Sequence, residues 1–300
     1  MLASIGHVTA PLKTRINLAI IESFPIDLYL GSLSAVKAVP SKKLELKNPA
    51  ILAFFSDFDG TITDEDSNDF MIDNFGMGRP ARRELLLKCL HEGLTFREAF
   101  RAMIDSVAQN KSFTECCELV RAANIKLDPG FKDFYLYLKS KGIPLVILSS
   151  GMSPIIRIII SNLIGDEEAA QLTIIANDVD LRGGDGSPGT WGVQFRHPES
   201  PFGHNKDVAI SEFREKNPGY TIFFSGDGIS DLSASRSATL FVKMREGSGD
   251  DLAAHCEKEN IPFEGFRSFR EVQRGVDAVF DNTLTLEKLC TGRNGHAEWY

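Results

Sequence analysis

The fold is decided by the stretch Ile51–Thr61, which reads ILAFFSDFDGT. Five consecutive apolar residues, Ile51–Phe55, lead directly into a polar segment that holds two aspartates, Asp57 and Asp59. A continuous rather than alternating apolar run predicts a strand buried on both faces, which is typical of a parallel sheet covered by helices. Ligands bind such sheets beyond the carboxyl ends of the strands, so the two aspartates stand where a site is expected.

Similar apolar runs recur downstream, and most of them end in a small or acidic polar cluster. They are Ile143–Leu148 before Ser149-Ser150-Gly151, Leu172–Ala176 before Asn177-Asp178, Tyr220–Phe224 before Ser225-Gly226-Asp227, and Thr239–Val242. We therefore predict an α/β fold, a Rossmann-like parallel sheet flanked by helices. Five glycines between 183 and 192 predict a turn-rich loop or hairpin tip.

The segment between the first two predicted strands has a different, helical character. Thr95 with Glu98, and Ser112 with Glu115, form capping-box patterns ahead of apolar residues at helical spacing. Another helix is expected after Gly151, where Ser153 can cap its start. The predicted domains are a small inserted helical cap, 68–125, and a core domain, 49–67 together with 126–290.

The first 48 residues call for a separate interpretation. Up to Ile21 they carry Lys13 and Arg15 and no acidic residue, which faintly resembles a mitochondrial transit peptide. The alternative is a flexible or loosely packed extension at 1–48. We expect a cytoplasmic protein, with mitochondrial targeting as the alternative.

Composition excludes several classes of protein. The 300 residues include 33 Lys and Arg against 41 Asp and Glu, a net charge of −8 that disfavours nucleic-acid binding. A small anionic substrate stays possible, because a few local dipoles and one lysine can hold it. No apolar run reaches the length of a membrane span, and the five cysteines, odd in number and without a C-x-x-C pair, predict reduced thiols.

The polar segments that follow the apolar runs carry the chemistry. Bringing the carboxylates of Asp57 and Asp59 together is unfavourable unless a cation or a proton relieves them. One Mg²⁺ would do so, because this ion prefers carboxylate, carbonyl and water oxygens. The second acidic cluster, with Asp227 and Asp231, also follows an apolar run and can supply further ligands.

Two more residues between the acidic clusters suit a phosphate group. Ser149 ends a predicted strand with a helix start behind it, and Lys206 begins a predicted helix. A hydroxyl, the amides of a helix N-terminus and an ammonium group are what a bound phosphate needs. Each residue alone also has an ordinary structural explanation, but their joint placement at strand ends favours a site.

These segments resemble the four ordered motifs of the haloacid dehalogenase superfamily over roughly residues 50 to 285. A helical cap between the first and second motifs is similar to the phosphoserine phosphatase branch. Further stretches resemble a fungal group that includes a polyol phosphatase. They are Glu65-Asp66-Ser67-Asn68-Asp69, Leu127-Asp128-Pro129-Gly130-Phe131-Lys132, Ser149-Ser150-Gly151-Met152 and Ser200-Pro201-Phe202-Gly203-His204-Asn205-Lys206.

The resemblance implies an aspartyl-phosphate mechanism. Asp57 would attack phosphorus, and Asp59 would act as general acid and then as general base. The implied magnesium ligands are the Asp57 carboxylate, the Asp59 main-chain carbonyl, Asp227 and Asp231. The implied phosphate contacts are Lys206, Ser149, Ser150 and Gly151. The commoner serine-glycine-glycine pattern is absent, so Ser149 and Ser150 are rival donors, and we favour Ser149 because it directly follows the strand.

The implied substrate is a small phosphorylated metabolite, such as a sugar-alcohol (polyol) phosphate. Candidate cap-side contacts are Glu65, Asp66, Asn68 and Arg79. Phosphoserine and the enol-phosphate intermediate of methionine salvage are the alternative substrates. The alternative from another class is a catalytically idle, phosphate-binding regulator, for which a missing nucleophile or metal-binding aspartate would be expected.

Overall fold

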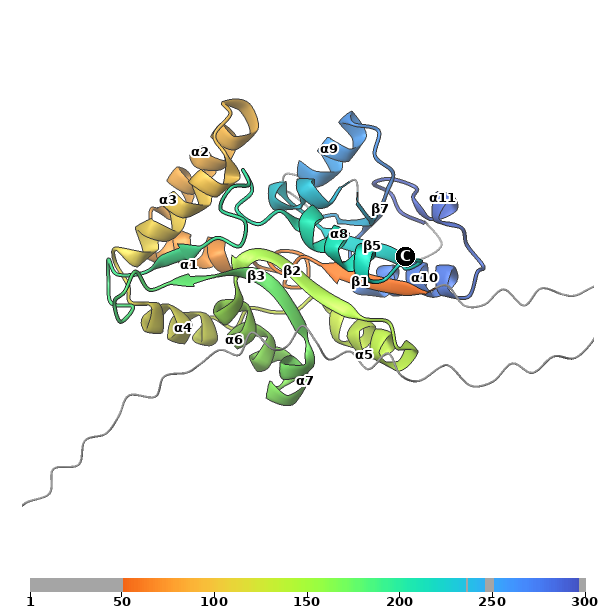
Figure 1. Cartoon of the computed structure of the whole chain (residues 1–300), viewed down its shortest axis with the longest axis horizontal. Coiled ribbons are helices and arrows are strands. Elements are labelled where there is room, and N and C mark those ends of the chain that lie inside the picture. The colour runs from red at the N-terminus through yellow and green to blue at the C-terminus, as the bar shows by residue number, and fades with distance from the viewer. Residues whose placement is uncertain (1–50, 236, 246–250, 297–300) are drawn as a thin grey trace, which may run out of the picture. The chain divides into compact units, whose positions relative to one another are not determined.

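The computed structural model describes residues 51–235, 237–245 and 251–296 (Figure 1). The predicted extension at 1–48 and its targeting alternative lie outside these residues. The described strands form a seven-stranded sheet in the order β4-β3-β2-β1-β5-β6-β7. Their bounds are β1 (Leu52–Ser56), β2 (Leu145–Met152), β3 (Thr173–Asp180), β4 (Gly192–Gln194), β5 (Thr221–Gly226), β6 (Thr239–Lys243) and β7 (Phe263–Phe266).

All neighbouring strands pair in parallel except β3 and β4, which pair antiparallel. The helices are α1 (Ser67–Phe75), α2 (Gly78–His91), α3 (Phe96–Ala108), α4 (Phe113–Ala122), α5 (Phe131–Lys141), α6 (Ser153–Ile164), α7 (Asp166–Gln171), α8 (Lys206–Lys216), α9 (Asp251–Lys258), α10 (Phe269–Phe280) and α11 (Leu286–Leu289), with a 3₁₀ helix, η2, at Ile229–Ala234. The predicted α/β class with a Rossmann-like parallel sheet is confirmed.

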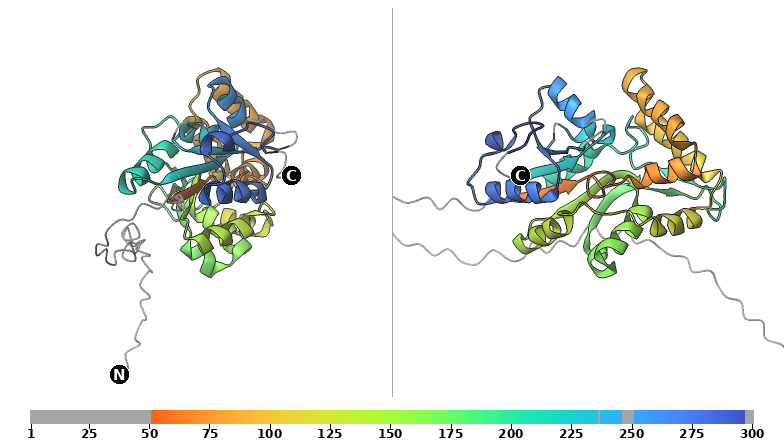
Figure 2. Two further views of the ribbon diagram at one scale, coloured as in Figure 1. Left: turned by 90° about the vertical axis from the view of Figure 1, so that its right-hand side faces the viewer. Right: turned by 180° about the vertical axis from the view of Figure 1, so that it is seen from behind.

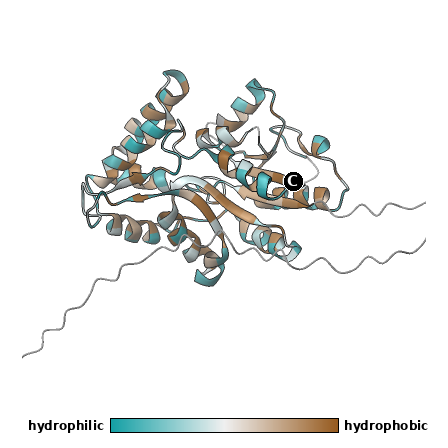
Figure 3. Cartoon of the chain, in the orientation of Figure 1, coloured by the Kyte–Doolittle hydropathy of each residue, from teal (hydrophilic) through white to brown (hydrophobic). Residues whose placement is uncertain are grey.

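Both faces of the central strands are buried, which explains their continuous apolar sequence. Phe54 belongs to a hydrophobic cluster with residues of α5, α6 and α10, whereas its neighbour Phe55 belongs to a second cluster with residues of α8 and α9. Consecutive strand residues point to opposite faces, so every position must be apolar. Figure 1 shows α5 and α6 on one side of the sheet and α8 on the other, and Figure 3 shows the apolar strands between them.

The glycine-rich stretch is a hairpin loop, as predicted, between β3 and β4. The loop contacts the inserted helices, because the Phe113 amide donates to the Gly186 carbonyl and the Gly189 amide to the Ala108 carbonyl. Trp191 is fully buried, and its indole nitrogen donates to the Lys111 carbonyl at 2.8 Å. The hairpin therefore holds the ends of α3 and α4 against the sheet domain.

Helices α1–α4 occupy the predicted insertion, and both predicted capping boxes are present at Thr95 and Ser112. The right-hand view of Figure 2, from behind, shows these helices at one end of the sheet and α10 and α11 (dark blue) at the other. Apolar residues of α1 and α3 share one hydrophobic cluster with the sheet. The separate-domain boundaries at 68–125 stay a prediction.

Some local predictions need correction. Ser153 is not the cap of α6: Met152, still paired within β2, precedes the helix, and the helix start has no side-chain cap. Strands β4 and β7 were not predicted, because they are only three and four residues long. All five cysteines are free thiols, as expected. Among the described residues, none of the helices combines the length and apolar character that crossing a bilayer demands.

Candidate active site

The parallel pairing of the central strands brings the predicted site residues to one edge of the sheet. Ser56 of β1 is in register with Ser225 of β5, and the Asp57 amide donates to the Ser225 carbonyl at 2.8 Å. The chains that leave both strands therefore run side by side. Beyond this edge lies a cavity of about 500 Å³, and its lining includes Asp57, Asp59 and Asp227.

Lys206 joins two of the acidic segments. Its side chain is fully buried, and its ammonium nitrogen lies 2.9 Å from an oxygen of Asp57 and 2.5 Å from one of Asp231. Burial alone lowers the pKa of Lys206, but attraction to Asp231 and Asp57 outweighs burial and raises it. Lys206 is thus held as a cation between two carboxylates.

Asp57 is 5% exposed, and its Oδ1 also accepts the amide of Phe58 at 2.8 Å. Burial and repulsion from Asp231 raise the pKa of Asp57 to about 7, although Lys206 opposes the change. The ionised carboxylate is therefore costly here without a further positive charge.

Three carboxylates converge at this point. One oxygen each of Asp57, Asp227 and Asp231 lies within 4.8 Å of the others. Asp231 accepts the amides of Asp227 and Gly228 at 2.9 and 3.1 Å, which fixes the turn after β5. Hard oxygen donors in such a cluster fit the needs of Mg²⁺.

The turn after Asp59 is also confined. Gly60 has a φ of +76°, and a Cβ there would lie 2.8 Å from an oxygen of Asp227. Asp227 further accepts the Thr61 hydroxyl at 3.0 Å and pairs with Arg245. Only glycine suits this position, because a side chain would enter the space between the two acidic segments.

Asp59 is held by the first residues of α1. Its Oδ1 accepts the amide of Ser67 at 2.8 Å and the Ser67 hydroxyl at 2.5 Å, and its Oδ2 accepts the side-chain amide of Asn68 at 2.9 Å. Burial, reinforced by repulsion from Asp66, raises the pKa of Asp59 well above its usual range. The carboxyl group is fixed in orientation and suited to carry a proton.

The opposite wall comes from the end of β2, where the pairing with β3 shifts between Ser149 and Met152. Ser149, Ser150 and Gly151 all line the cavity. The Gly151 amide donates to the Ser149 hydroxyl at 3.0 Å, so this N–H is already used, while the serine proton stays available for donation. A Cβ on Gly151 would approach Asp59 Oδ2 to 2.9 Å, which makes glycine necessary.

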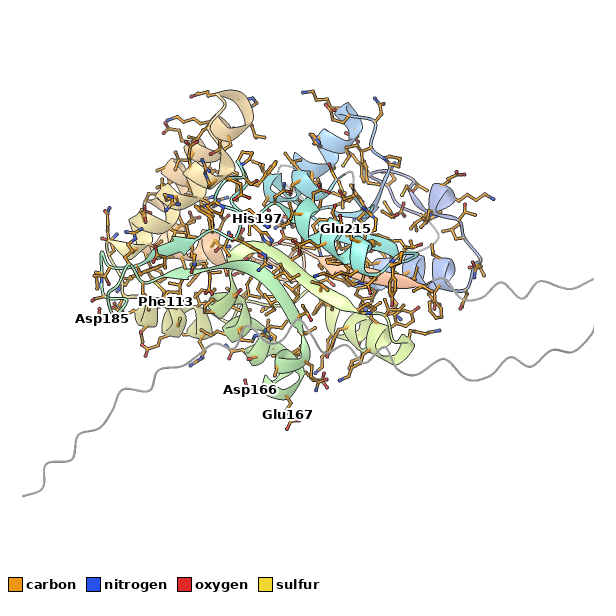
Figure 4. All side chains as sticks on the ribbon, in the orientation of Figure 1. Phe113, Asp166, Glu167, Asp185, His197 and Glu215 are labelled. Carbon is orange, nitrogen blue, oxygen red and sulfur yellow. The ribbon has the colours of Figure 1, made fainter. Side chains whose placement is uncertain are left out.

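His204 supports this wall from behind. Its Nδ1 lies 2.7 Å from the Ser149 carbonyl oxygen, and its ring is fully buried. The ring lies beside that of His197, a residue of the segment between β4 and α8 that is labelled in Figure 4. A carbonyl only accepts, so Nδ1 carries the proton. Burial lowers the pKa of His204 to about 3, and the ring is neutral.

The inserted helices supply the remaining wall. Asp66 caps α1 by accepting the amides of Asn68 and Asp69, and all three residues line the cavity. Arg82 of α2, also in the lining, pairs with Asp69 and Asp73. Arg83 of α2 lines the cavity as well, and the rest of this wall is apolar: Ile72, Leu86, Leu87, Leu90, Phe96, Phe100 and Met103.

The structure brings most of the predicted site residues together, but not all of them. Glu65 and Arg79 are exposed and are not among the residues that line the cavity. Lys206 and Asp231 are also absent from the lining, but they are fully buried and joined to Asp57 through Lys206. Sequence reasoning did not single out Ser67, Asp69, Arg82, Arg83 or Arg245. Ser67 and Asp69 lie in the stretch Glu65–Asp69, which resembles the fungal polyol phosphatase group. The three arginines belong to no motif that would indicate a site.

The comparison with protein families agrees with this geometry. Residues 54–236, more than half of the chain, match the model of the haloacid dehalogenase-like hydrolases. The chain belongs to this family. The predicted superfamily is confirmed.

Two relatives extend the assignment of this haloacid dehalogenase-like hydrolase. It is 40% identical over 234 residues to Pdp3-interacting factor 1 of Schizosaccharomyces pombe, covering 76% of this chain and 96% of that protein. It is 34% identical over 245 residues to the polyol phosphate phosphatase PYP1 of Saccharomyces cerevisiae, covering 78% and 96%. The predicted class of enzyme, a phosphatase of this family, is confirmed.

A solved structure supports the fold. A phosphoserine phosphatase in its apo form matches with a TM-score of 0.53 and 17% identity, covering 75% of this chain and 98% of that one. At this identity the match shows the shared architecture of the core and nothing about the substrate.

Proposed function

We propose that this protein is a Mg²⁺-dependent phosphatase that hydrolyses small phosphomonoesters, such as sugar-alcohol phosphates, through an aspartyl-phosphate on Asp57. The observation that carries the proposal is that Asp57, Asp59 and Asp227 line one cavity, while the buried Lys206 contacts Asp57 from behind the lining. Three segments distant in the chain supply these groups, so chance clustering explains them poorly.

The reaction follows from the two aspartates. A carboxylate oxygen of Asp57 attacks phosphorus, the P–O bond to the substrate alcohol breaks, and Asp59 gives its proton to the departing oxygen. Asp59 then takes a proton from water, whose oxygen attacks phosphorus and releases inorganic phosphate from Asp57. The hydrogen bonds from Ser67 and Asn68 keep the Asp59 carboxyl directed into the cavity through both steps.

Mg²⁺ would be held by the carboxylates of Asp57 and Asp227 and the main-chain carbonyl of Asp59, with Asp231 a direct ligand or a water-mediated one. When bound, the ion neutralises charge on the phosphoryl oxygens. The crowding of Asp57, Asp227 and Asp231 in this buried setting supports the assignment.

The phosphoryl group would be bound by Lys206, Ser149 and Ser150. Lys206 neutralises phosphoryl oxygens and favours the ionised form of Asp57, against the effects of burial and Asp231. Ser149 donates its hydroxyl proton, since its acceptor capacity already serves the Gly151 amide. The role of Gly151 is to allow close approach, because a Cβ there would touch Asp59.

A small substrate suits the volume of the cavity and its position beneath α1–α3, which we propose as a cap that excludes water. Asp66 and Asn68 are the proposed cap-side contacts. The contacts predicted for Glu65 and Arg79 stay predictions. The named activity of the relative PYP1 supports polyol phosphates as the substrate class.

The test is phosphate release from a panel of esters, measured with Mg²⁺ and again with excess EDTA. The panel contains sugar-alcohol phosphates, phosphoserine and an enol-phosphate. We expect Mg²⁺-dependent release that is fastest with a sugar-alcohol phosphate. Binding of phosphate without hydrolysis of any ester would favour the idle regulator and overturn the proposal.

A further inference from the structure

Two residues that line the cavity each carry a buried polar atom without the hydrogen bond that such groups require. Within residues 51–235, 237–245 and 251–296, the side-chain oxygens of Asn68 and Ser150 are buried without a hydrogen-bond partner, and both residues line the cavity. Asn68 is only 7% exposed and Ser150 only 6%. Buried polar groups are nearly always paired, so these atoms indicate a polar ligand in this cavity.

The position of Asn68 defines what that ligand must offer. Its Nδ2 donates to Asp59 Oδ2 at 2.9 Å, and its main-chain amide donates to Asp66, so the side chain is anchored at both ends. With Nδ2 committed to Asp59, the free Oδ1 is an acceptor, and only a donor satisfies it. A Cβ on Gly151 would lie 3.3 Å from Asn68 Nδ2, so the amide faces the end of β2.

The two carboxylates on this wall nearest to Asn68 in the chain already have partners. Asp66 accepts two amides of α1 through Oδ1, and Asp69 pairs with Arg82. The Asn68 carbonyl oxygen differs from them in having no partner, and it belongs to an amide group that contacts Asp59. Because Asp59 would protonate the departing ester oxygen, a group that meets Asn68 belongs to the part of the substrate next to that oxygen.

We infer that Asn68 Oδ1 accepts a hydrogen bond from a substrate hydroxyl on the carbon adjacent to the ester carbon, and so selects vicinal hydroxy phosphate esters. This inference rests on the proposed phosphatase function and specifies its substrate class. The ester oxygen and a neighbouring hydroxyl lie close together in such a molecule. One can therefore face Asp59 while the other faces the adjacent amide of Asn68.

The test compares two substrates that differ by this one hydroxyl. Glycerol 3-phosphate carries it, and 3-hydroxypropyl phosphate lacks it but keeps the terminal hydroxyl. We expect wild-type kcat/KM to be roughly 10- to 100-fold higher for glycerol 3-phosphate, the range that one buried hydrogen bond supplies. In Asn68→Leu, which has a similar shape and no acceptor, we expect the ratio to fall to about one.

Ser67→Ala is the matched control. Ser67 and Asn68 both donate to Asp59, but the Ser67 hydroxyl is satisfied by that bond. Ser67→Ala should therefore lower kcat/KM for both esters by a similar factor and preserve their ratio. If Asn68→Leu does not fold, as judged by circular dichroism, Asn68→Ala replaces it.

Two results would overturn the inference alone. They are equal wild-type kcat/KM for the two esters, and an unchanged preference in the folded Asn68 variant, which would mean that Asn68 only positions Asp59. Absence of phosphate release from every ester of the panel would instead overturn the proposed function itself. The two failures are therefore distinguishable.

Discussion

Two lysines are buried among the residues that the structure describes, Lys206 and Lys243, and their local settings are similar. The ammonium of Lys206 lies 5.5 Å from the ring centre of Phe224, and that of Lys243 lies 5.4 Å from the ring centre of Phe266. Each ammonium also contacts at least one buried carboxylate. The difference between them lies in those carboxylates.

The partner of Lys243 is Asp128, and the pair is balanced. The other oxygen of Asp128 accepts the amides of Gly130 and Phe269 at 2.8 and 3.0 Å, at the starts of α5 and α10. This carboxylate therefore joins the starts of two helices. Neither Lys243 nor Asp128 lines the cavity, whereas Lys206, itself buried behind the lining, contacts the lining residue Asp57.

Lys206, in contrast, faces an excess of negative charge. It contacts both Asp57 and Asp231, and the carboxylate of Asp227 lies close to both of them. A stabilising pair needs one anion for each cation, whereas clustered carboxylates are unfavourable without a further positive charge. The comparison indicates that the Lys243 pair serves the fold and that the Lys206 cluster is arranged for a ligand.

The largest effect that separates the two regions should be on turnover. Asp57→Asn removes the nucleophile and should lower kcat roughly 10⁴-fold or more, with the fold retained. Phosphate release and circular dichroism, measured on the same preparation, check both statements. Turnover close to that of the wild type would require another nucleophile, and it would remove the functional difference between the Lys206 cluster and the Lys243 pair.

Asp128→Asn should affect stability instead. It keeps an acceptor for the two helix amides but leaves the Lys243 ammonium buried without its counter-charge, which should lower the free energy of unfolding by about 3 to 5 kcal/mol. Urea unfolding measures this change. At temperatures where the variant is folded, we expect kcat near that of the wild type, and a 10⁴-fold loss would contradict the structural role.

In the metal-free protein, the excess of negative charge around Lys206 should also make the free energy of unfolding depend on pH. The pKa of Asp57 is raised from 3.8 to about 7 in the folded protein, so its stabilising contribution is complete below pH 3.8 and is lost as pH rises through about 7. Asp57→Asn removes this loss. In EDTA the variant should exceed the wild type in stability by roughly 1 to 4 kcal/mol at pH 8, with a smaller difference at pH 5. An equal pH dependence of the free energy of unfolding in the two proteins would show that the pKa of Asp57 is not raised by folding.

The smallest expected effect is stabilisation by Mg²⁺. An ion that binds only the folded state raises the melting temperature. At Mg²⁺ concentrations well above Kd, binding should raise the free energy of unfolding by about 2 to 3 kcal/mol. We expect a rise of several degrees for the wild type and for Asp128→Asn, and little or none for Asp227→Asn. Differential scanning fluorimetry measures these melting temperatures. An equal rise in the wild type and both variants would place the ion outside the acidic cluster.

The sequence predicts the parts of this molecule that depend on local pattern. β1, β2, β3, β5 and β6 are found at the continuous apolar runs, because burial on both faces leaves a signal in each strand. β7 leaves none, since its four residues include Glu264, which is buried and accepts the amides of Thr291 and His296 from the later chain. That partnership exists only in the folded structure.

The same limit applies to the site. Asp57, Ser149, Lys206 and Asp227 follow strands or begin a helix, so topology alone brings them to one edge. The cap-side wall depends instead on how α2 packs on α1. Arg79 lies one helical turn before Arg82 and Arg83, and it is those two that line the cavity. A displacement of one turn cannot be read from sequence periodicity.

The most direct test of the central claim is to identify the residue that carries phosphate during turnover. Enzyme mixed with a good substrate and Mg²⁺ would be quenched rapidly, reduced with borohydride and digested for mass spectrometry. Reduction converts an aspartyl-phosphate to homoserine, and we predict homoserine at position 57, absent when substrate is omitted. Homoserine at Asp227 or Asp231, or turnover with no modified aspartate, would contradict the account.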